Sequence, residues 1–262
     1  VLDRILPAED IDISNFALKS FEKQGIKIKT SSTVKSLKTS KGKISVQIET
    51  MAGSEEVSVE KVILAVGIIG NTENLGLENT SAKVSNGQLV VDKWGATHEP
   101  GLHAIGDLVG APWLAHKASH EGVICVERIA GLENVHPLDS SNIPGCTYSR
   151  PQVASVGLTQ KLAEDAGHKV RVGHFPFIGN GKAIALGEMD GFVKTVFDAT
   201  TGELLGAHMI GAEVTEMIQG YTVARTLETT ENELLNTVFP HPTLSEMMHE
   251  SVLDAFDRAI HI

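Results

Sequence analysis

The chain has 262 residues, 42% of them hydrophobic and 21% charged, which is enough for one large globular domain or two to three small ones. A net charge of −11 argues against nucleic acid or an anionic membrane as a partner, and no apolar run is long enough to span a bilayer. The opening lacks Met and a signal-peptide pattern, as expected for a chain entered in the middle. Cys125 and Cys146 are far apart and form no redox or metal-binding spacing, which fits a reducing compartment.

Residues 1–69 alternate a helix with short apolar strands. The apolar spacing predicts a helix from about Asp10 or Asp12 to Gly25, with strands over 2–6 and 26–28. A Lys-Gly-Lys turn at 41–43 then joins two strands of alternating pattern into a hairpin, and a further strand begins near Val57.

The apolar run 62–66 ends this segment at Gly67. A run that is apolar at every position is typical of a parallel strand buried on both faces. With the preceding helix and hairpin it indicates the second half of a dinucleotide-binding domain. The glycine-rich phosphate fingerprint that opens such a domain is absent from the sequence.

Residues 70–141 place a carboxylate ahead of a helix. The stretch Ala104-Ile105-Gly106-Asp107, preceded by a short strand over 87–92, predicts a strand that ends with Asp107 at the edge of a sheet, where it can bind a ribose-type hydroxyl. A helix from near Leu114 to Gly131 would direct free N–H groups and the positive end of its dipole at a ligand lying before it.

Two histidines share one face of this predicted helix. His116 and His120 have the i, i+4 spacing found in some metal sites, but no third ligand lies nearby in the sequence. We therefore predict no metal site.

The polar, proline-bounded residues 136–145 form the best candidate for a domain boundary. Beyond them the pattern indicates an antiparallel α+β unit. The predicted strands are 153–156, 169–175, 183–188, 192–198 and 204–210, and the predicted helices are 159–167, 214–227 and 231–239.

Near the C-terminus, His241 stands between two prolines. Pro242 disfavours helical backbone at His241, so this residue should be extended, ahead of a helix running to about Ile260. Thr243 and Glu246 have the spacing of a capping box. The helix dipole would lower the pKa of His241, whereas Glu246 folded onto the ring would raise it and select the tautomer. The pattern predicts a general base, with a capping box that carries no chemistry as the alternative.

Several of these stretches together resemble one known family. HPTLSE (241–246), LAHKASHEG (114–122) and GELLGAHMIG (202–211) are similar to the flavin-dependent pyridine nucleotide-disulfide oxidoreductases, and among them to the dihydrolipoamide dehydrogenases. The resemblance covers essentially the whole chain but only the C-terminal portion of a typical member.

The resemblance implies a fold of α/β plus α+β class with three parts. Residues 1–69 would be the second half of an NAD-binding domain, and 70–141 the C-terminal part of an FAD-binding domain. Residues 142–262 would be an antiparallel interface domain that pairs two chains in a homodimer. In that dimer the histidine of HPTLSE completes the active site of the other subunit, facing its redox disulfide.

The resemblance also implies roles for individual residues. His241 would remove a thiol proton from dihydrolipoamide, and Glu246 would orient and charge its ring. Asp107 would bind the ribityl chain of FAD, and Val34 and Gly67 would belong to the NAD site. The residues implied at the edge of the flavin ring are Trp113, Leu114, Ala115 and His116.

The sequence departs from the family pattern in places. Residues 68–72 lack the usual basic residues and proline, so NAD and NADP preference are not distinguished, and Arg150 stands where relatives often have His. Because no closely spaced cysteine pair is present, we expect these residues alone to be inactive, with FAD and NAD incompletely held or absent.

The implied setting is a 2-oxoacid dehydrogenase complex, with its acyltransferase component as partner. It would lie in the cytoplasm of a bacterium or, alternatively, in the mitochondrial matrix. Two other hypotheses stay open: a non-catalytic dimerisation module, and a related disulfide reductase that acts on another thiol.

Overall fold

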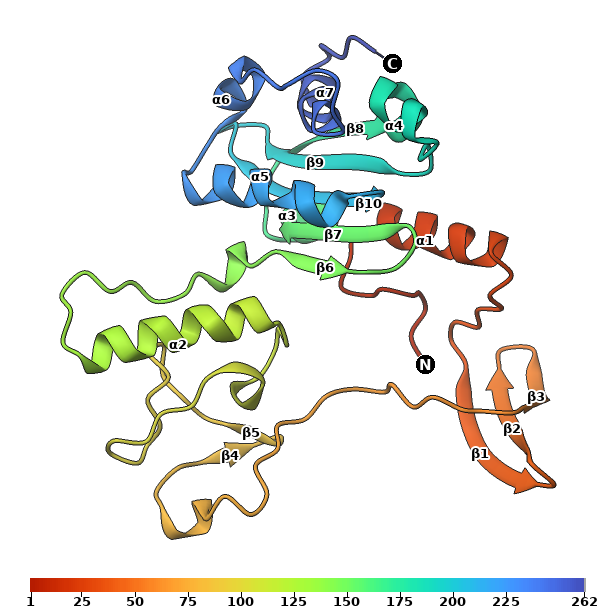
Figure 1. Cartoon of the computed structure of the whole chain (residues 1–262), viewed down its shortest axis with the longest axis vertical. Helices are drawn as coiled ribbons and strands as arrows, with labels where there is room; N and C mark the ends of the chain where they lie inside the picture. Colours follow the sequence, from red (N-terminus) through yellow and green to blue (C-terminus); the bar gives the residue numbers. More distant parts are fainter. Residues whose placement is uncertain (262) are drawn as a thin grey trace. The chain divides into compact units, whose positions relative to one another are not determined.

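The computed structural model describes residues 1–261, which fall into two compact units. The first unit combines Val1–Val62 with the chain from Ser141 onward, and the second is Ile63–Ser140. Figure 1 labels the helices and strands of both units. Among the described residues, no helix has the length and apolar character needed to cross a bilayer.

A five-stranded antiparallel sheet forms the centre of the first unit, in the order β6-β7-β10-β9-β8. Its strands are β6 (Gly145–Thr147), β7 (Gln152–Gly157), β8 (Val170–Pro176), β9 (Phe192–Asp198) and β10 (Leu204–Gly211). All residues of β9 and β10 are buried, because both faces of the sheet are covered. The antiparallel unit predicted after residue 142 is therefore present.

One face of this sheet carries the largest apolar core. Alternate residues of the central strands, including Phe197 and Met209, pack with Ile218 and Val252 from two helices. The helices that surround the sheet are α3 (Gln160–Asp165), α4 (Gly181–Leu186), α5 (Val214–Thr226), α6 (Glu231–Asn236) and α7 (Glu246–Ala255).

The predicted N-terminal helix is confirmed as α1 (Ile11–Lys23). It begins where the Asp10 carboxylate accepts a hydrogen bond from the Asp12 N–H, as helix N-caps do. Its buried Ile13 and Ala17 pack against Phe192 and other residues of the five-stranded sheet. This burial is the reason that α1 belongs to the same compact unit as the sheet.

The predicted hairpin is also confirmed. Strands β1 (Thr33–Ser40), β2 (Lys43–Thr50) and β3 (Gly53–Val59) form a separate antiparallel sheet. The turn between β1 and β2 places Lys41 and Gly42 at positive φ, as a two-residue hairpin loop requires.

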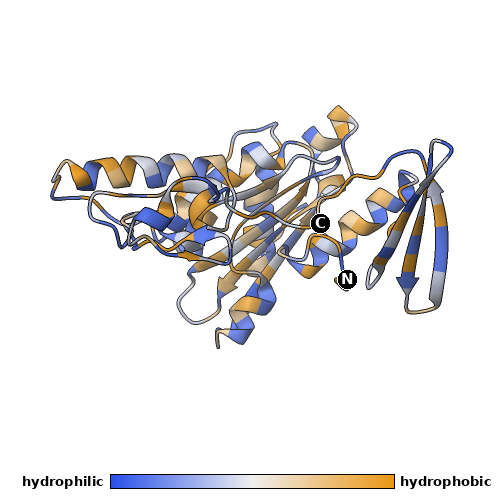
Figure 2. Cartoon of the chain, turned by 90° about the horizontal axis from the view of Figure 1, so that it is seen from below, coloured by the Kyte–Doolittle hydropathy of each residue, from blue (hydrophilic) through white to orange (hydrophobic). Residues whose placement is uncertain are grey.

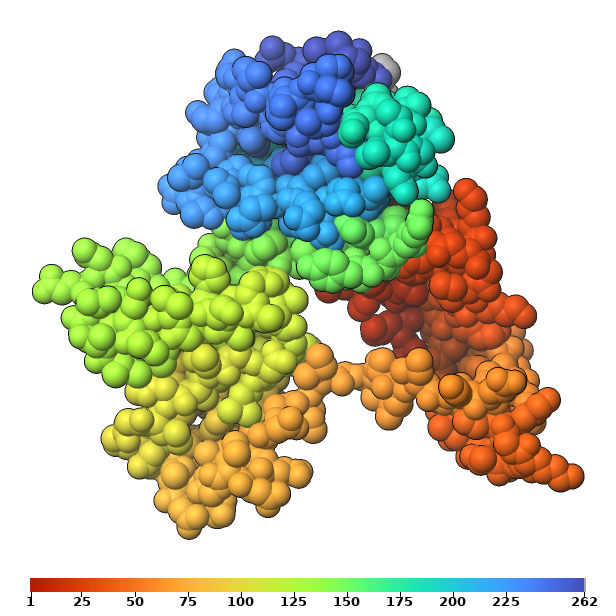
Figure 3. Space-filling view, in the orientation of Figure 1, coloured from red at the N-terminus to blue at the C-terminus, as the bar shows by residue number. Residues whose placement is uncertain are grey.

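Three predicted strands of the first 69 residues are not formed. Residues 2–6, 26–28 and 62–66 have no strand structure, and Leu64 and Val66 are 80% and 86% exposed. Figure 3 shows this last stretch as a thin orange segment. A parallel strand exists only through hydrogen bonds to neighbouring strands, and none of the described strands pairs with these residues.

A fourth strand prediction, 183–188, is wrong because residues 183–186 belong to α4 and Gly187 follows as its C-cap. The Asn180 side chain accepts a hydrogen bond from the Ala183 N–H at the start of the helix, and Gly187 ends it in the left-handed conformation. Two helix ends also differ from prediction, since α6 ends at Asn236 and α7 at Ala255.

The second unit contains one long helix, α2 (Ala115–Ile129), close to the predicted bounds. Polar and apolar residues alternate along this helix (Figure 2), and Val123, Val126 and Ile129 are more than half exposed. The strand predicted to end at Asp107 is replaced by a 3-10 turn.

The shorter elements of the chain are β4 (Val84–Ser85), β5 (Gln88–Leu89), η1 (Leu77–Asn79), η2 (Gly106–Val109), η3 (Ser140–Asn142) and η4 (Phe177–Gly179).

Candidate active site

His241 and Glu246 form a hydrogen-bonded pair at the start of α7. The His241 Nδ1 lies 2.9 Å from Glu246 Oε1, and the second carboxylate oxygen accepts the Thr243 N–H at 2.9 Å. The His241 side chain is 78% exposed, whereas that of Glu246 is 27% exposed. The imidazole is thus held at one nitrogen by Glu246 and is largely exposed to solvent.

The charge state of Glu246 favours one tautomer of His241. Burial by itself would raise the pKa of Glu246, but the hydrogen bonds from the Thr243 N–H and from His241 outweigh it, and the pKa is lowered. A carboxylate at Nδ1 keeps the proton on that nitrogen, so Nε2 is the nitrogen that can accept a proton from a substrate.

The predicted capping box is only half formed. Glu246 accepts the Thr243 N–H, but the Thr243 hydroxyl donates to the Pro240 carbonyl at 2.6 Å rather than capping α7. Glu246 therefore holds both the backbone of the loop and the imidazole, and helix capping alone does not account for its position.

Two residues that sequence reasoning did not single out fix this loop and helix. Asn180, 5% exposed, donates from Nδ2 to the Thr243 carbonyl at 3.1 Å. Tyr221, fully buried, donates its hydroxyl to the Met248 carbonyl of α7 at 2.8 Å. An asparagine before a helix is a recognisable N-cap signal, but its second contact joins residues 63 positions apart.

The second unit holds the residues implied for FAD. Asp107 is exposed in η2, and Leu114 precedes α2 without any side-chain cap on the helix. The Trp113 Nε1 is buried and, within residues 1–261, has no hydrogen-bond partner. The Trp113 N–H is thus an unsatisfied donor next to the uncapped N-terminus of α2. Both groups favour a ligand with a polar edge that gains negative charge, as the flavin ring does on reduction, so these residues fit a flavin. Ala115 and His116 form the first turn of α2.

Of the residues implied for NAD, Val34 belongs to the first unit and Gly67 to the second. Val34 lies on β1 with 57% of its surface exposed. Gly67 lies in the strandless segment after residue 62, and a Cβ added to it would meet nothing within 4 Å. No close approach of protein atoms requires glycine there, but its φ of 151° favours glycine.

Cys125 is buried and Cys146 half-buried, and both are free thiols. Within the described part of the chain, no three His, Cys, Asp or Glu side chains gather as a metal site would require.

Both halves of the chain match models of one protein family. Residues 1–122 match the model described as pyridine nucleotide-disulphide oxidoreductase, and residues 143–252 match the dimerisation domain of the same family. The chain belongs to the pyridine nucleotide-disulphide oxidoreductase family. This confirms the resemblance inferred from the sequence motifs.

Members of this family that are similar to the chain include two curated bacterial proteins. The dihydrolipoyl dehydrogenase of Zymomonas mobilis is 57% identical over 261 residues, covering 98% of this chain and 56% of that protein. The dihydrolipoyl dehydrogenase of Rhizobium etli is 55% identical, covering 100% of this chain and 54% of that protein. The chain thus spans about half the length of these relatives.

A solved member of the family shares the fold. The crystal structure of LpdA from Mycobacterium tuberculosis superposes with a TM-score of 0.87 at 27% identity, covering 96% of this chain and 54% of that one. The expected fold class, α/β elements followed by an antiparallel α+β interface domain, is confirmed by this match and by the two family models.

Proposed function

We propose that these residues form the C-terminal portion of an NAD-dependent dihydrolipoamide dehydrogenase. The observation that carries the proposal is the His241–Glu246 pair, an exposed imidazole with a carboxylate 2.9 Å from Nδ1. The names of the two bacterial relatives support the choice of dihydrolipoamide over other thiols.

In this function His241 acts as the general base. Nε2 accepts a proton from a thiol of dihydrolipoamide, and Glu246 stabilises the imidazolium that results. The thiolate formed in this way would attack a redox disulfide to give a mixed disulfide and one cysteine thiolate. The second thiol of the substrate, deprotonated in turn, would displace the other cysteine sulfur, so that the substrate leaves as cyclic lipoamide and the cysteine pair is left reduced. Cys125 and Cys146 do not supply this disulfide, since each is a free thiol and they are far apart in sequence. We therefore propose that residues 1–262 are inactive by themselves.

Asp107 and the start of α2 provide the residues for FAD. Asp107 would accept hydrogen bonds from ribityl hydroxyls, and the Trp113 indole N–H would donate to the ring edge. When bound, FAD carries electrons from the reduced cysteine pair to NAD. The roles of Val34 and Gly67 toward NAD stay a prediction, and no step is assigned to them.

The dimerisation-domain match supports a homodimer formed through residues 142–262. In such a dimer, the exposed His241 of one chain would complete the active site of the other. We further propose that the dimer binds the acyltransferase component of a 2-oxoacid dehydrogenase complex. The two bacterial relatives favour the bacterial cytoplasm over the mitochondrial matrix as its location.

The test is His241→Gln in the full-length protein that contains these residues. Loss of the general base should lower kcat for dihydrolipoamide oxidation by about 10²- to 10⁴-fold. His98→Gln is the matched control, because His98 is exposed and lies in the second unit. Sedimentation of both variants measures the fraction of the protein that is dimeric.

Each alternative predicts a different result. Turnover that survives His241→Gln while the dimer weakens would favour the non-catalytic dimerisation module. A higher kcat/KM for another dithiol or monothiol than for dihydrolipoamide, with the same loss in His241→Gln, would favour a related disulfide reductase.

A further inference from the structure

Lys117, the third residue of α2, is a buried cation. It is 6% exposed, and its Nζ donates to the Gly110 carbonyl at 3.0 Å and reaches the Gly106 carbonyl at 3.4 Å. These two carbonyls stand at opposite ends of the turn 106–110, which contains Asp107. One ammonium group therefore bridges the two ends of that turn.

Glu121 completes the arrangement one helical turn later. Its Oε1 lies 2.9 Å from Lys117 Nζ, and its Oε2 accepts the Gly106 N–H at 2.7 Å. The Lys117 charge is thus paired, as a buried ammonium requires, and the start of the Asp107 turn is held by both residues. A carboxylate with two charge-assisted hydrogen bonds is a rigid support.

The turn also lies directly against α2. Gly106 has φ of 72°, and a Cβ added to it would come 3.1 Å from the Ala118 Cβ. Close backbone approach and the Lys117–Glu121 pair therefore fix the turn relative to the first two turns of the helix. Asp107 itself remains exposed at the surface of this support.

We propose that Lys117 and Glu121 are positioning residues that hold Asp107 for FAD and so set the affinity of the protein for FAD. The inference rests on the proposed function, since it takes FAD as the ligand of Asp107. Its physical basis is preorganisation: when the backbone of the turn that carries a carboxylate is held in place before binding, less ordering is needed for that carboxylate to accept the ribityl hydroxyls.

The experiment is a double-mutant cycle in the full-length protein, with FAD binding to the apoprotein measured by flavin fluorescence. Lys117→Met should raise the Kd for FAD by about 10-fold or more, the scale of one lost charge-assisted hydrogen bond. In the Asp107→Asn background the same substitution should change the Kd by less than about 3-fold, because the group it positions is already altered. A merely structural role would weaken binding equally in both backgrounds.

Two further variants keep the test decisive. Glu121→Gln preserves the shape and an acceptor for the Gly106 N–H while removing the charge partner of Lys117, and it should raise the Kd in the same direction. Lys161→Met, which removes an exposed i, i+4 ion pair on α3, should leave the Kd unchanged. Hydrogen exchange of the peptide containing residues 104–112 should be faster in Lys117→Met, with the C-terminal half of α2 unaffected.

The outcomes distinguish a failure of the proposed function from a failure of the positioning role alone. If the unsubstituted protein binds no FAD, the proposed function and this inference both fail. If it binds FAD but Lys117→Met and Glu121→Gln bind it equally well, or if the cycle shows equal losses in both Asp107 backgrounds, only the positioning role is overturned.

Discussion

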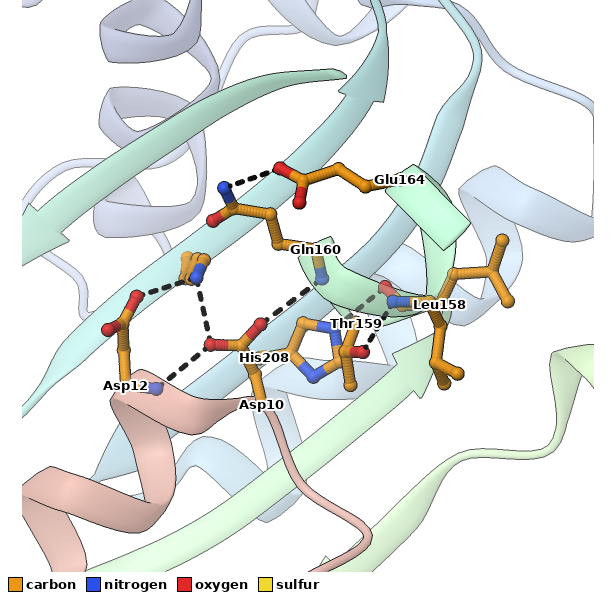
Figure 4. Close-up of polar contacts among 9 residues, drawn as sticks. Asp10, Asp12, Leu158, Thr159, Gln160, Glu164 and His208 are labelled. Atoms are coloured by element: carbon orange, nitrogen blue, oxygen red, sulfur yellow. Dashed lines mark hydrogen bonds and ion pairs between the residues drawn. The ribbon is translucent and has the colours of Figure 1, made fainter. Parts of the chain in front are cut away.

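Lys194 on β9 lies 2.8 Å from Asp10, the residue that caps α1, and both side chains are 1% exposed. Lys194 also lies 2.6 Å from Asp12, and the second Asp10 oxygen accepts the Gln160 N–H at 3.2 Å (Figure 4). Burial would raise the pKa of Asp10, but Lys194 and the Asp12 N–H outweigh it, and the pKa is lowered. A buried ionic network therefore ties α1 to the sheet.

Lys194→Met should unfold the first unit much more readily. It leaves Asp10 buried without its cation, a change that costs about 3–5 kcal/mol in the free energy of unfolding. Urea denaturation of the full-length protein measures this free energy of unfolding. The control is Lys161→Met, which removes an exposed ion pair and should change the free energy of unfolding by less than about 0.5 kcal/mol. A Lys194→Met protein as stable as this control would show that the network contributes nothing.

Gly173→Ala should push α7 away from β8. An added Cβ would lie 1.8 Å from the Ser251 carbonyl oxygen, so backbone must move. We expect a loss of about 1–3 kcal/mol of stability, as for overpacked cores. Under the proposed function, turnover of dihydrolipoamide should also fall, because Glu246 starts this helix. The matched control is Gly181→Ala, where nothing lies within 4 Å of the added Cβ. Equal melting temperatures for the two variants would contradict the close packing.

Glu246→Gln should remove a pH-dependent part of the stability. The folded pKa of Glu246 lies below 4.5, so its carboxylate stabilises the folded state above that pH, and the effect is lost as the pH falls through the folded pKa. The difference in free energy of unfolding between the unsubstituted and Glu246→Gln proteins should shrink from pH 6 toward pH 3, as followed by denaturation at each pH. A constant difference would argue against the ionised pair.

Asp198 should contribute stability over a lower pH window. Its pKa is lowered to about 2, first by the hydrogen bond with His168 and then by the N–H groups of Thr200 and Thr201. A depressed carboxyl pKa gives stability that is complete above 3.8 and is lost as the pH falls toward 2. Asp198→Asn should therefore flatten the acid unfolding curve between these values, with Asp165→Asn on exposed α3 as control. An acid unfolding curve that is the same with and without Asp198→Asn would contradict the lowered pKa of Asp198.

Local patterns predicted much of the first unit, because the interactions that define those elements are close in sequence. The hairpin β1–β2 follows from alternation around Lys41-Gly42, and α1 from its apolar spacing and its stop at Gly25. The apolar stretch 183–188 predicts a strand only weakly, because short apolar runs do not distinguish strand from helix. The capping Asn180 and the terminal Gly187 are the local signals that favour the helix.

The sequence by itself determined the family, the antiparallel unit and the contact between His241 and Glu246, which are only five positions apart and flank the start of one helix. Only the tertiary structure decided that Lys194 neutralises Asp10, 184 positions away, and that Asn180 holds the backbone of Thr243. It likewise decided that the apolar run 62–66 forms no strand here. The physical reason is common to all three: a buried charge, a distant hydrogen bond and a parallel strand each depend on a partner that local sequence does not specify.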